Sequence, residues 1–235
     1  MANTANLNLP LLEAAQAQKH VTVNEALAVL DGLSQAVLRS ITTPSPPGGA
    51  DEGALYAVPG GAGGDWAGED GKLAVFSNGG WVFVTPRTGW SGWVADQGVT
   101  ARYDGTEWQP SAAAISPGGA ASIVEVVEID HDLTTGTANQ TVSVIPANSV
   151  VFGVSGRVLS AFGGSLTSWQ LGVAGSANRY GSGLGTEVGA WVMGLTGQPQ
   201  AYYSDTPLEL TATGGAFQDG RVRLAVHIYR ITLPR

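Results

Sequence analysis

The chain has 235 residues, of which 43% are hydrophobic and only 13% are charged, and it carries 34 glycines, no cysteine and a net charge of −8. This composition excludes disulfides and thiolate metal sites. With only 11 Lys and Arg residues, the acidic balance argues against binding to nucleic acid or to anionic lipid. The many glycines favour short strands joined by tight turns over long helices.

No segment of the sequence looks like a targeting signal or a membrane span. Residues 1–10 are polar and lack a basic start followed by an apolar run, which argues against a secretory signal. No stretch reaches the roughly 20 apolar residues that cross a bilayer, so membrane insertion is not expected. If the protein acts outside the cell, we expect it to be made in the cytoplasm and released by lysis or within a larger particle.

The clearest helix is predicted over about residues 11–40, with a weak point at residues 21–23, where β-branched residues cluster. Its apolar residues are spaced three and four apart in turn, as in a coiled-coil seam: Val23, Ala26, Leu30, Leu33 and Val37. So short a helix is marginal as an isolated coiled coil. The seam indicates either a helix packed on its own domain's sheet or, as we favour, an oligomerisation contact between subunits. Leu27 and Leu38 widen the seam, which favours a trimer or a helix packed among β elements.

A stiff linker is predicted at residues 42–49, because three prolines exclude a helix there. The Gly-rich stretch that follows contains two short hairpin signals. Each places an aromatic residue before an Asn-Gly or Asp-Gly turn and a Trp after it, at residues 76–81 and 103–108. These patterns predict a small Trp/Gly-rich β module over residues 50–110, whose five tryptophans mainly fill the core.

A low-complexity segment at residues 111–122 predicts the boundary to the last domain, residues 120–235. Strands are expected there at residues 123–129, 140–145, 150–159, 168–173, 190–195, 208–213 and 221–233. The last alternates between apolar and polar residues, so one face is buried and the other is wet or contacts a partner. The predicted fold class is therefore mainly β. A short N-terminal helical segment (residues 1–43) and the β module precede an antiparallel β-sandwich or jelly roll.

No residue pattern supports catalysis or a metal site. The three histidines, His20, His131 and His227, are far apart and lack ligand spacing. Adjacent acids at residues 51–52 and 69–70 fall in Gly-rich turns, where we expect them to be solvated, and no calcium loop, phosphate loop or nucleophile elbow is present. The glycine cluster at residues 181–185 is interpreted as a flexible loop tip. We expect a protein that is not an enzyme and that uses no cofactor and no metal.

Aromatic residues give the better indication of a binding site. Sugar rings stack on exposed aromatic faces, while Asn, Asp and Gln accept hydrogen bonds from their hydroxyls. In the C-terminal part, several aromatic residues fall in or beside loop-like stretches, where recognition is usually found. The candidate residues for contact with a receptor or glycan are Trp169, Tyr180, Trp191, Tyr202 and Tyr203.

The N-terminal half carries a distinctive pattern. It has Leu-Pro-Leu-Leu at residues 9–12, Gln-Ala-Gln-Lys at residues 16–19, Asn-Glu-Ala-Leu at residues 24–27 and a Trp- and Gly-rich stretch at residues 64–90. Over about residues 5–110 the chain resembles an uncharacterised domain family of prophages and gene transfer agents of alphaproteobacteria. The resemblance implies a virion-associated protein encoded among tail-fibre or head-spike genes, whose N-terminal part attaches and whose C-terminal part meets the host. No catalytic residues come with this family.

Together these observations predict a spike or fibre subunit of a phage-like particle. We expect a homo-oligomer, most simply a trimer, that contacts other particle proteins and binds a host surface polysaccharide or receptor. Many copies on one particle would compensate for weak single contacts. Two alternatives stay open: a purely structural spike base or adaptor that anchors another fibre, and a polysaccharide depolymerase. The depolymerase is least favoured, because the acids of the C-terminal part are few and no spacing marks a catalytic pair.

Overall fold

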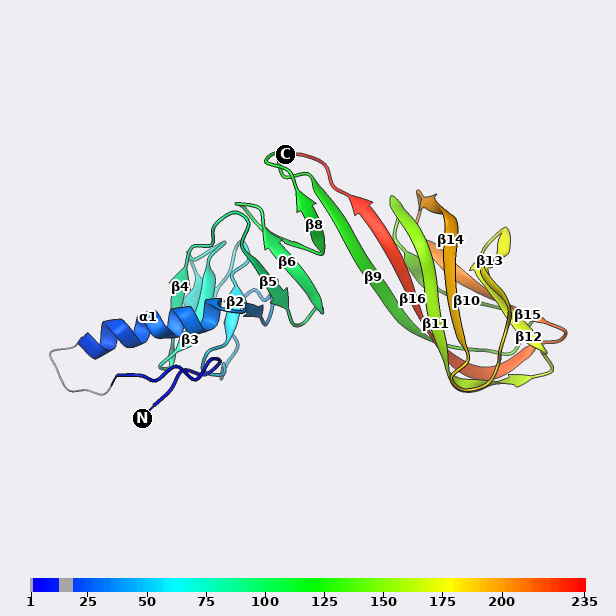
Figure 1. Ribbon diagram of the computed structural model, residues 1–235, viewed down its shortest axis with the longest axis horizontal. Helices are drawn as coiled ribbons and strands as arrows, with labels where there is room; N and C mark the ends of the chain where they lie inside the picture. The colour runs from blue at the N-terminus through cyan, green and yellow to red at the C-terminus, as the bar shows by residue number, and fades with distance from the viewer. Residues whose placement is uncertain (1, 13–18) are drawn as a thin grey trace. The chain divides into compact units, whose positions relative to one another are not determined.

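The computed structural model describes residues 2–12 and 19–235 and divides into two compact units (Figure 1). The first comprises Met1–Ala121 together with Arg235, and the second comprises Ser122–Pro234. Strands account for 53% of the chain and helix for 7%, which confirms the mainly β fold class. The helical segment and the Trp/Gly-rich strands belong to the same first unit, and the chain passes into the second unit at residues 121–122.

The described residues of the first unit form one α-helix, α1 (Lys19–Leu33), and a sheet with the strand order β4-β3-β2-β1-β5-β6-β7. The central strand β1 pairs in parallel with β2 and β5, whereas the outer pairs are antiparallel. The strands of this unit are β1 (Val37–Leu38), β2 (Leu55–Ala57), β3 (Leu73–Ser77), β4 (Gly80–Val84), β5 (Ser91–Val94), β6 (Val99–Tyr103), β7 (Trp108–Pro110) and β8 (Ala112–Ile115).

Both predicted hairpins are present in this sheet, but they differ in build. Asn78 and Gly79 form a two-residue loop between β3 and β4, with φ angles of 52° and 77°. The loop between β6 and β7 has four residues, residues 104–107. There the Asp104 carboxylate accepts hydrogen bonds from the backbone N–H groups of Thr106 and Glu107, at 2.8 and 3.0 Å. The side chain of an aspartate therefore closes the longer turn.

Buried side chains lie on both faces of this sheet. On one face they include Leu38, Leu73 and Val75, against which α1 packs. On the other, Trp66 in the short 3-10 helix η1 (Gly64–Trp66) is fully buried, with its ring centroid 5.1 Å from that of Trp81. Trp66 thus fills the core as predicted for the tryptophans of this region.

The helix is shorter than predicted, and the predicted seam is divided. It ends at Leu33 because Gln35 takes a left-handed φ of 75° and the following residues join the sheet as β1. Residues 13–18 of the predicted helix lie outside the described residues. The seam positions fall in three places: Val23, Ala26 and Leu30 are exposed on α1, Leu33 packs into the core, and Val37 lies in β1. Assigning Val37 to a helical stripe was therefore wrong.

Residues 2–12 fold back on themselves, with a turn at residues 5–7 and an antiparallel bridge between Asn3 and Pro10, and a buried carboxylate holds them to α1. Asp31 accepts hydrogen bonds from the Thr4 hydroxyl at 2.6 Å and from the backbone N–H groups of Asn6 and Leu7 at 2.8 and 2.6 Å. Burial acts to raise the pKa of Asp31, but these hydrogen bonds outweigh burial and lower the pKa below its ordinary value. The ionised carboxylate therefore secures the start of the chain.

The second unit is a sandwich of two antiparallel sheets. Within it the strand orders are β14-β11-β16-β9 and β10-β15-β12-β13. Counted along the chain as strands one to eight, these orders are 6-3-8-1 and 2-7-4-5, the topology of a jelly roll. The strands are β9 (Ala121–Asp132), β10 (Ala138–Ile145), β11 (Ser149–Gly164), β12 (Ser168–Val173), β13 (Ser176–Leu184), β14 (Trp191–Tyr202), β15 (Thr206–Thr213) and β16 (Phe217–Ile231).

The jelly-roll core lies between the two sheets and follows the alternation predicted for the last strand. Val222, Leu224 and Val226 of β16 are fully buried, while the residues between them face outward. The opposite sheet contributes Trp169, whose indole N–H donates to the Gly185 carbonyl at 2.8 Å. The glycine cluster at residues 181–185, expected to be a flexible loop tip, lies mainly in β13, so that expectation was wrong.

Candidate functional site on the jelly roll

The outward face of the β14-β11-β16-β9 sheet carries the candidate site. Directly paired residues of antiparallel strands point to the same face, so the strand register defines rows of neighbouring side chains. One row across the four strands is Trp191, Arg157, Arg223 and Asp130, and the next is Met193, Ser155, Ala225 and Glu128. These two rows form what we call the polar end of the face.

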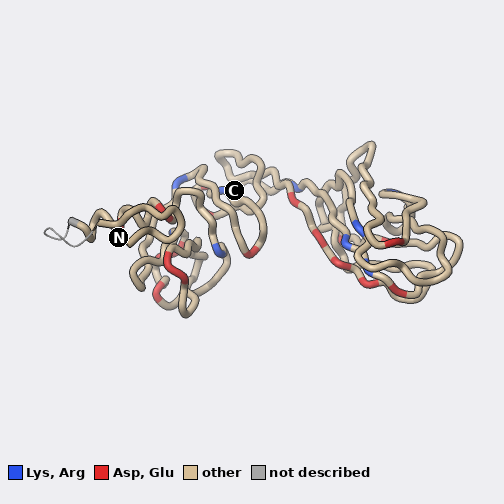
Figure 2. Tube along the Cα trace, turned by 60° about the horizontal axis from the view of Figure 1, so that its bottom comes forward, with Lys and Arg blue, Asp and Glu red and all other residues tan. Residues whose placement is uncertain are grey.

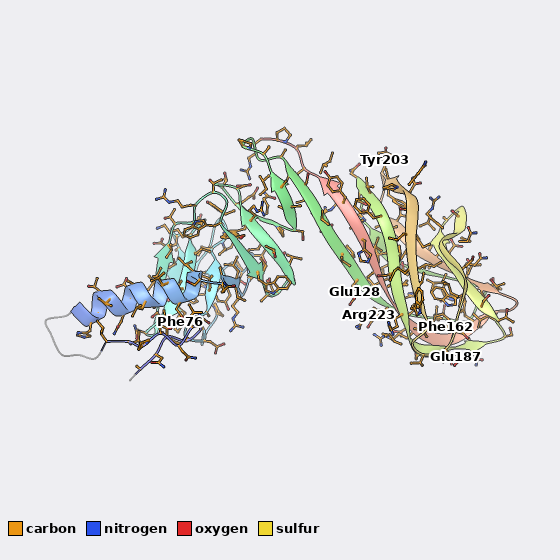
Figure 3. All side chains as sticks on the ribbon, in the orientation of Figure 1. Phe76, Glu128, Phe162, Glu187, Tyr203 and Arg223 are labelled. Atoms are coloured by element: carbon orange, nitrogen blue, oxygen red, sulfur yellow. The ribbon has the colours of Figure 1, made fainter. Side chains whose placement is uncertain are left out.

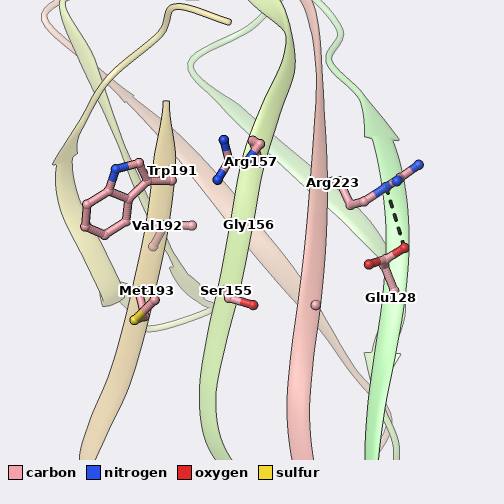
Figure 4. A pocket seen from close by; sticks show the side chains of 9 residues that line it. Glu128, Ser155, Gly156, Arg157, Trp191, Val192, Met193 and Arg223 are labelled. Carbon is pink, nitrogen blue, oxygen red and sulfur yellow. Dashed lines mark ion pairs between the residues drawn. The ribbon is translucent and has the colours of Figure 1, made fainter. Parts of the chain in front are cut away.

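A groove of about 440 Å³ lies over the polar end (Figure 4). Its lining includes Trp191 and Met193 from β14, Ser155 and Arg157 from β11, Arg223 from β16 and Glu128 from β9. This volume falls in the range of sites that hold small ligands, roughly 300–1,000 Å³. The lining combines an aromatic ring and a thioether with charged and hydroxyl groups, so both stacking and hydrogen bonding are available to a ligand.

Trp191 supplies the aromatic surface of the groove. It is the first residue of β14, and its neighbour Val192 points inward into the core, which turns the indole outward. The side chain is 65% exposed, and Figure 4 shows it projecting from the strand on the side of the groove away from Glu128. An exposed, flat indole on a rigid strand is the kind of surface on which a sugar ring stacks.

The two arginines of the groove differ in how their charges are used. Arg223 donates two hydrogen bonds to the Asp130 carboxylate, at 2.7 and 2.9 Å, and lies 3.6 Å from Glu128. The hydrogen bond from Arg223 lowers the pKa of Asp130, and the same contact raises the pKa of Arg223. Arg157, by contrast, is exposed and has no hydrogen bond or ion pair with the described residues. Its guanidinium therefore stays available for an anionic or hydroxylated ligand.

Acidic and basic residues gather on the strands of this sheet, as Figure 2 shows for the second unit. The acids lie mainly on β9 and the arginines on β11 and β16. Arg221 and Arg223 both contact Asp130, and Arg221 also lies 3.6 Å from Asp132. Most of the charge on the face is thus neutralised within the sheet, which makes Arg157 the exception among the described arginines of this face.

The structure separates the five predicted recognition residues. Trp169 and Tyr180 are 1% and 2% exposed, so neither side chain is available for the predicted contact with a ligand. Tyr202 is half-buried, and its hydroxyl bonds to that of Tyr180 at 2.7 Å; burial raises the pKa of Tyr180. Trp191 and Tyr203 are exposed, but they lie at opposite ends of β14, and Tyr203 is far from the labelled groove residues in Figure 3. Only Trp191 lines the groove.

The sequence did not single out the other groove residues. Arg157, Ser155, Glu128 and Met193 look like ordinary outward positions of alternating strands. What distinguishes them is the pairing of three strands that are far apart in the sequence. The alternation of apolar and polar residues in the sequence marks all four as outward-facing. It does not show that they lie in two adjacent rows of the same sheet.

Three acids of the jelly roll that a depolymerase could use are hydrogen-bonded within the protein. Asp130 is bound to Arg223, Asp205 accepts a hydrogen bond from the Ala147 N–H at 2.7 Å, and Asp219 accepts one from the Gly163 N–H at 3.1 Å. Within residues 2–12 and 19–235, no group of three or more metal-binding side chains is placed to hold an ion. In the same part of the chain, no helix has the length and apolar character needed to cross a membrane.

Comparison with known proteins bears on the first unit. Residues 23–109 match the family described as "Protein of unknown function (DUF2793)". That match lies within the first unit and leaves the jelly roll outside it. The family description names no function. The link to prophages and gene transfer agents therefore stays a proposal, and no curated protein matches the chain.

A phage capsid structure is among the solved structures that are similar to part of the chain. A chain of the "Cyanophage Pam1 capsid asymmetric unit" is 25% identical, with a TM-score of 0.35. The similarity covers 51% of this chain and 91% of the phage chain.

Proposed function

We propose that this chain is a spike or fibre subunit of a phage-like particle and that its jelly roll binds a saccharide on the host cell surface. The observation that carries the binding part is the groove, where the exposed indole of Trp191 lies beside the unpaired guanidinium of Arg157. Aromatic stacking fixes the plane of a sugar ring, and the arginine supplies donors to its oxygens.

The groove suits an oxygen-rich ligand better than an apolar one. Ser155 offers a hydroxyl, Glu128 offers acceptor oxygens and Arg157 offers donors, all beside one aromatic ring. Each such contact with a flexible, hydrated sugar is weak, because ordering and desolvation offset most of the gain. Several copies on one particle raise the effective concentration at a polysaccharide surface, so weak sites are sufficient.

The particle role rests on the first unit. Residues 5–110 resemble domains of prophage and gene-transfer-agent proteins, and the jelly roll lies outside that region as a separate unit. We assign attachment to the particle to the first unit and host contact to the second. The protein would then reside in the virion or phage-like particle, assembled as a homo-oligomer that we expect to be a trimer.

Saccharide binding is tested by screening the full-length protein on immobilised capsular and O-antigen polysaccharides. Wild type is expected to bind at least one of them, and Trp191→Ala is expected to weaken that binding at least tenfold. Trp93→Ala is the matched control, because Trp93 is also exposed, at 47%, but lies in the first unit. Binding by Trp191→Ala at the wild-type level would assign recognition to another surface, and no binding by wild type would refute the proposal.

A purely structural adaptor is the second candidate function. It is favoured by exposed apolar side chains in the first unit, which a neighbouring particle protein would cover: Val21, Val23 and Leu30 on α1, Val37 on β1 and Trp93 on β5. An adaptor would bind no polysaccharide and would co-assemble with a fibre protein of the same particle. The polysaccharide screen therefore separates the two candidates.

A further inference from the structure

The outward face that carries the groove also carries a row of exposed apolar side chains. We call the apolar strip the exposed side chains of Val124 and Val126 on β9, Phe152 on β11 and Leu195 on β14, together with the half-buried Tyr229 on β16. The register places Val126 opposite His227 and Val124 opposite Tyr229, and it places Leu195 level with His227 across β11. The strip therefore crosses all four strands beside the polar end.

The strip is unusual for a sheet face exposed to water. Val124, Val126 and Leu195 are 53%, 55% and 78% exposed, and Phe152 is 42% exposed. The outward face of an antiparallel sheet is ordinarily polar. The second sheet of the same jelly roll follows this rule, because its outward positions on β12 and β15 include Gln170, Glu209 and Thr211. The apolar strip is thus a property of one face only, and such patches mark contact surfaces.

We infer that the apolar strip is the contact between copies of this chain, with the strips of neighbouring copies facing one another about the symmetry axis. A saccharide is a poor occupant, since the aliphatic side chains of Val124, Val126 and Leu195 offer no hydrogen-bond partners. Because these side chains are large and exposed, the strip leaves an apolar surface area on the order of several hundred Å² in contact with water. This area approaches one partner's share of a standard interface. A second copy brings an equal apolar area and closes the assembly.

Charge also favours a copy of the chain over a partner of opposite charge. The strip holds no Asp, Glu, Lys or Arg, and His227, which lies beside Val126, shares a hydrogen bond of 3.0 Å with the Ser155 hydroxyl. At its margin, Glu128 lies 3.6 Å from the Arg223 guanidinium, which also binds Asp130. A neutral apolar surface with its flanking charges satisfied internally can meet an identical surface without repulsion, whereas it offers no net charge to attract a strongly acidic or basic protein.

The strip is ordered before association. The Phe152 and Tyr229 rings meet edge to face, with centroids 6.5 Å apart, and the Tyr229 hydroxyl bonds to the Ser122 hydroxyl at 3.0 Å. Side chains that are already fixed lose little entropy on binding. The polar end stays outside the contact, because removing Arg157 and the pairs around Asp130 from water is costly. The groove would therefore remain open at the edge of the interface.

The test is the oligomeric state of the full-length chain, measured by sedimentation velocity over a concentration series. Wild type is expected to form a discrete oligomer. Leu195→Asp and Val126→Asp are each expected to raise its dissociation constant at least 100-fold, because each places a charge inside the contact. Val142→Asp is the matched control, since Val142 is 71% exposed on the other sheet. It is expected to leave the assembly unchanged.

Three outcomes would overturn this inference. These are a monomeric wild type at all concentrations, intact assembly in both strip variants, or dissociation by Leu30→Asp on α1 with no effect of Leu195→Asp. Circular dichroism and hydrogen exchange of each variant establish that it is folded, so a monomer reports on the contact. The inference is independent of the saccharide, because a monomeric Leu195→Asp variant should still bind a polysaccharide probe through its single groove.

Discussion

Truncating the two tryptophans of the jelly roll should have very different effects on its stability, and Trp169→Ala should be the more damaging change. The Trp169 side chain is 1% exposed, and its ring centroid lies 5.4 Å from that of Phe162. Its indole N–H donates to the Gly185 carbonyl at 2.8 Å, which ties β12 to the end of β13. Alanine would leave a cavity between the two sheets and an unpaired carbonyl.

The expected loss follows from these contacts. Truncating a buried aromatic side chain to alanine lowers the free energy of unfolding by about 3–5 kcal/mol. Since about 1.4 kcal/mol corresponds to a factor of ten, the open population of the jelly roll should rise by about 10²- to 10³-fold. Hydrogen exchange with mass spectrometry on peptides from β12 and β15 measures this rise, because the most protected amides exchange through global opening.

The matched control is Trp191→Ala. Its side chain is 65% exposed on the outward face, so the free energy of unfolding should change by no more than about 0.5 kcal/mol. Exchange from the same peptides should then stay within about threefold of wild type. Less than a tenfold increase for Trp169→Ala, or equal increases for the two variants, would refute the assignment of one tryptophan to the core and the other to the groove.

Three further contacts each predict a measurable loss of stability. Burial raises the pKa of Asp104, but the Arg235 guanidinium and three other hydrogen bonds outweigh it and lower the pKa to about 2. The contact therefore stabilises the first unit above about pH 4, and this stabilisation is lost as the pH falls through 2. Arg235→Gln should lower the stability of the first unit at neutral pH and move the midpoint of its acid unfolding to higher pH, as measured by circular dichroism. Asp31→Asn should expose residues 2–12 to protease, because an amide accepts fewer of the three hydrogen bonds. Gly172→Ala should lower the melting temperature, because its Cβ would lie 2.0 Å from a β13 carbonyl oxygen, whereas Gly197→Ala, with open space around it, should not.

Much of the fold could be predicted because its signals are local. Alternation along β16 and the short apolar runs of the other strands mark the strands of the jelly roll and the direction of their side chains. The jelly-roll order could not be predicted, because pairs such as β9 with β16 join residues about a hundred positions apart. The strand β13 was missed because Gly181, Gly183 and Gly185 resemble a loop. The helix end was missed because only the left-handed backbone of Gln35 sets it.

The candidate site could be predicted only in part, for a reason that Trp169 and Trp191 illustrate. Both are tryptophans near strand ends, and composition gives them equal weight as ligand contacts. They differ in which face of their strand they occupy. Trp169 points into the core together with Leu171, whereas on β14 it is Val192 that points into the core, so Trp191 points outward. Which of two alternating faces a side chain occupies can be assigned only once the core-facing positions of its strand are known. Arg157 became a candidate only from the structure, in which the neighbouring Arg223 is bound to Asp130 while Arg157 has no such partner among the described residues.

One sheet face thus presents two surfaces that differ in the ligands they can accept. The polar end holds charges that are expensive to bury between proteins, while the apolar strip lacks the donors and acceptors that a sugar needs. The division between them lies at a step of two residues along each strand, from Trp191 and Met193 to Leu195 on β14 and from Glu128 to Val126 on β9. Assembly through the strip would therefore bring several grooves to one rim. Weak saccharide sites arranged in this way gain affinity from their number without any new contact.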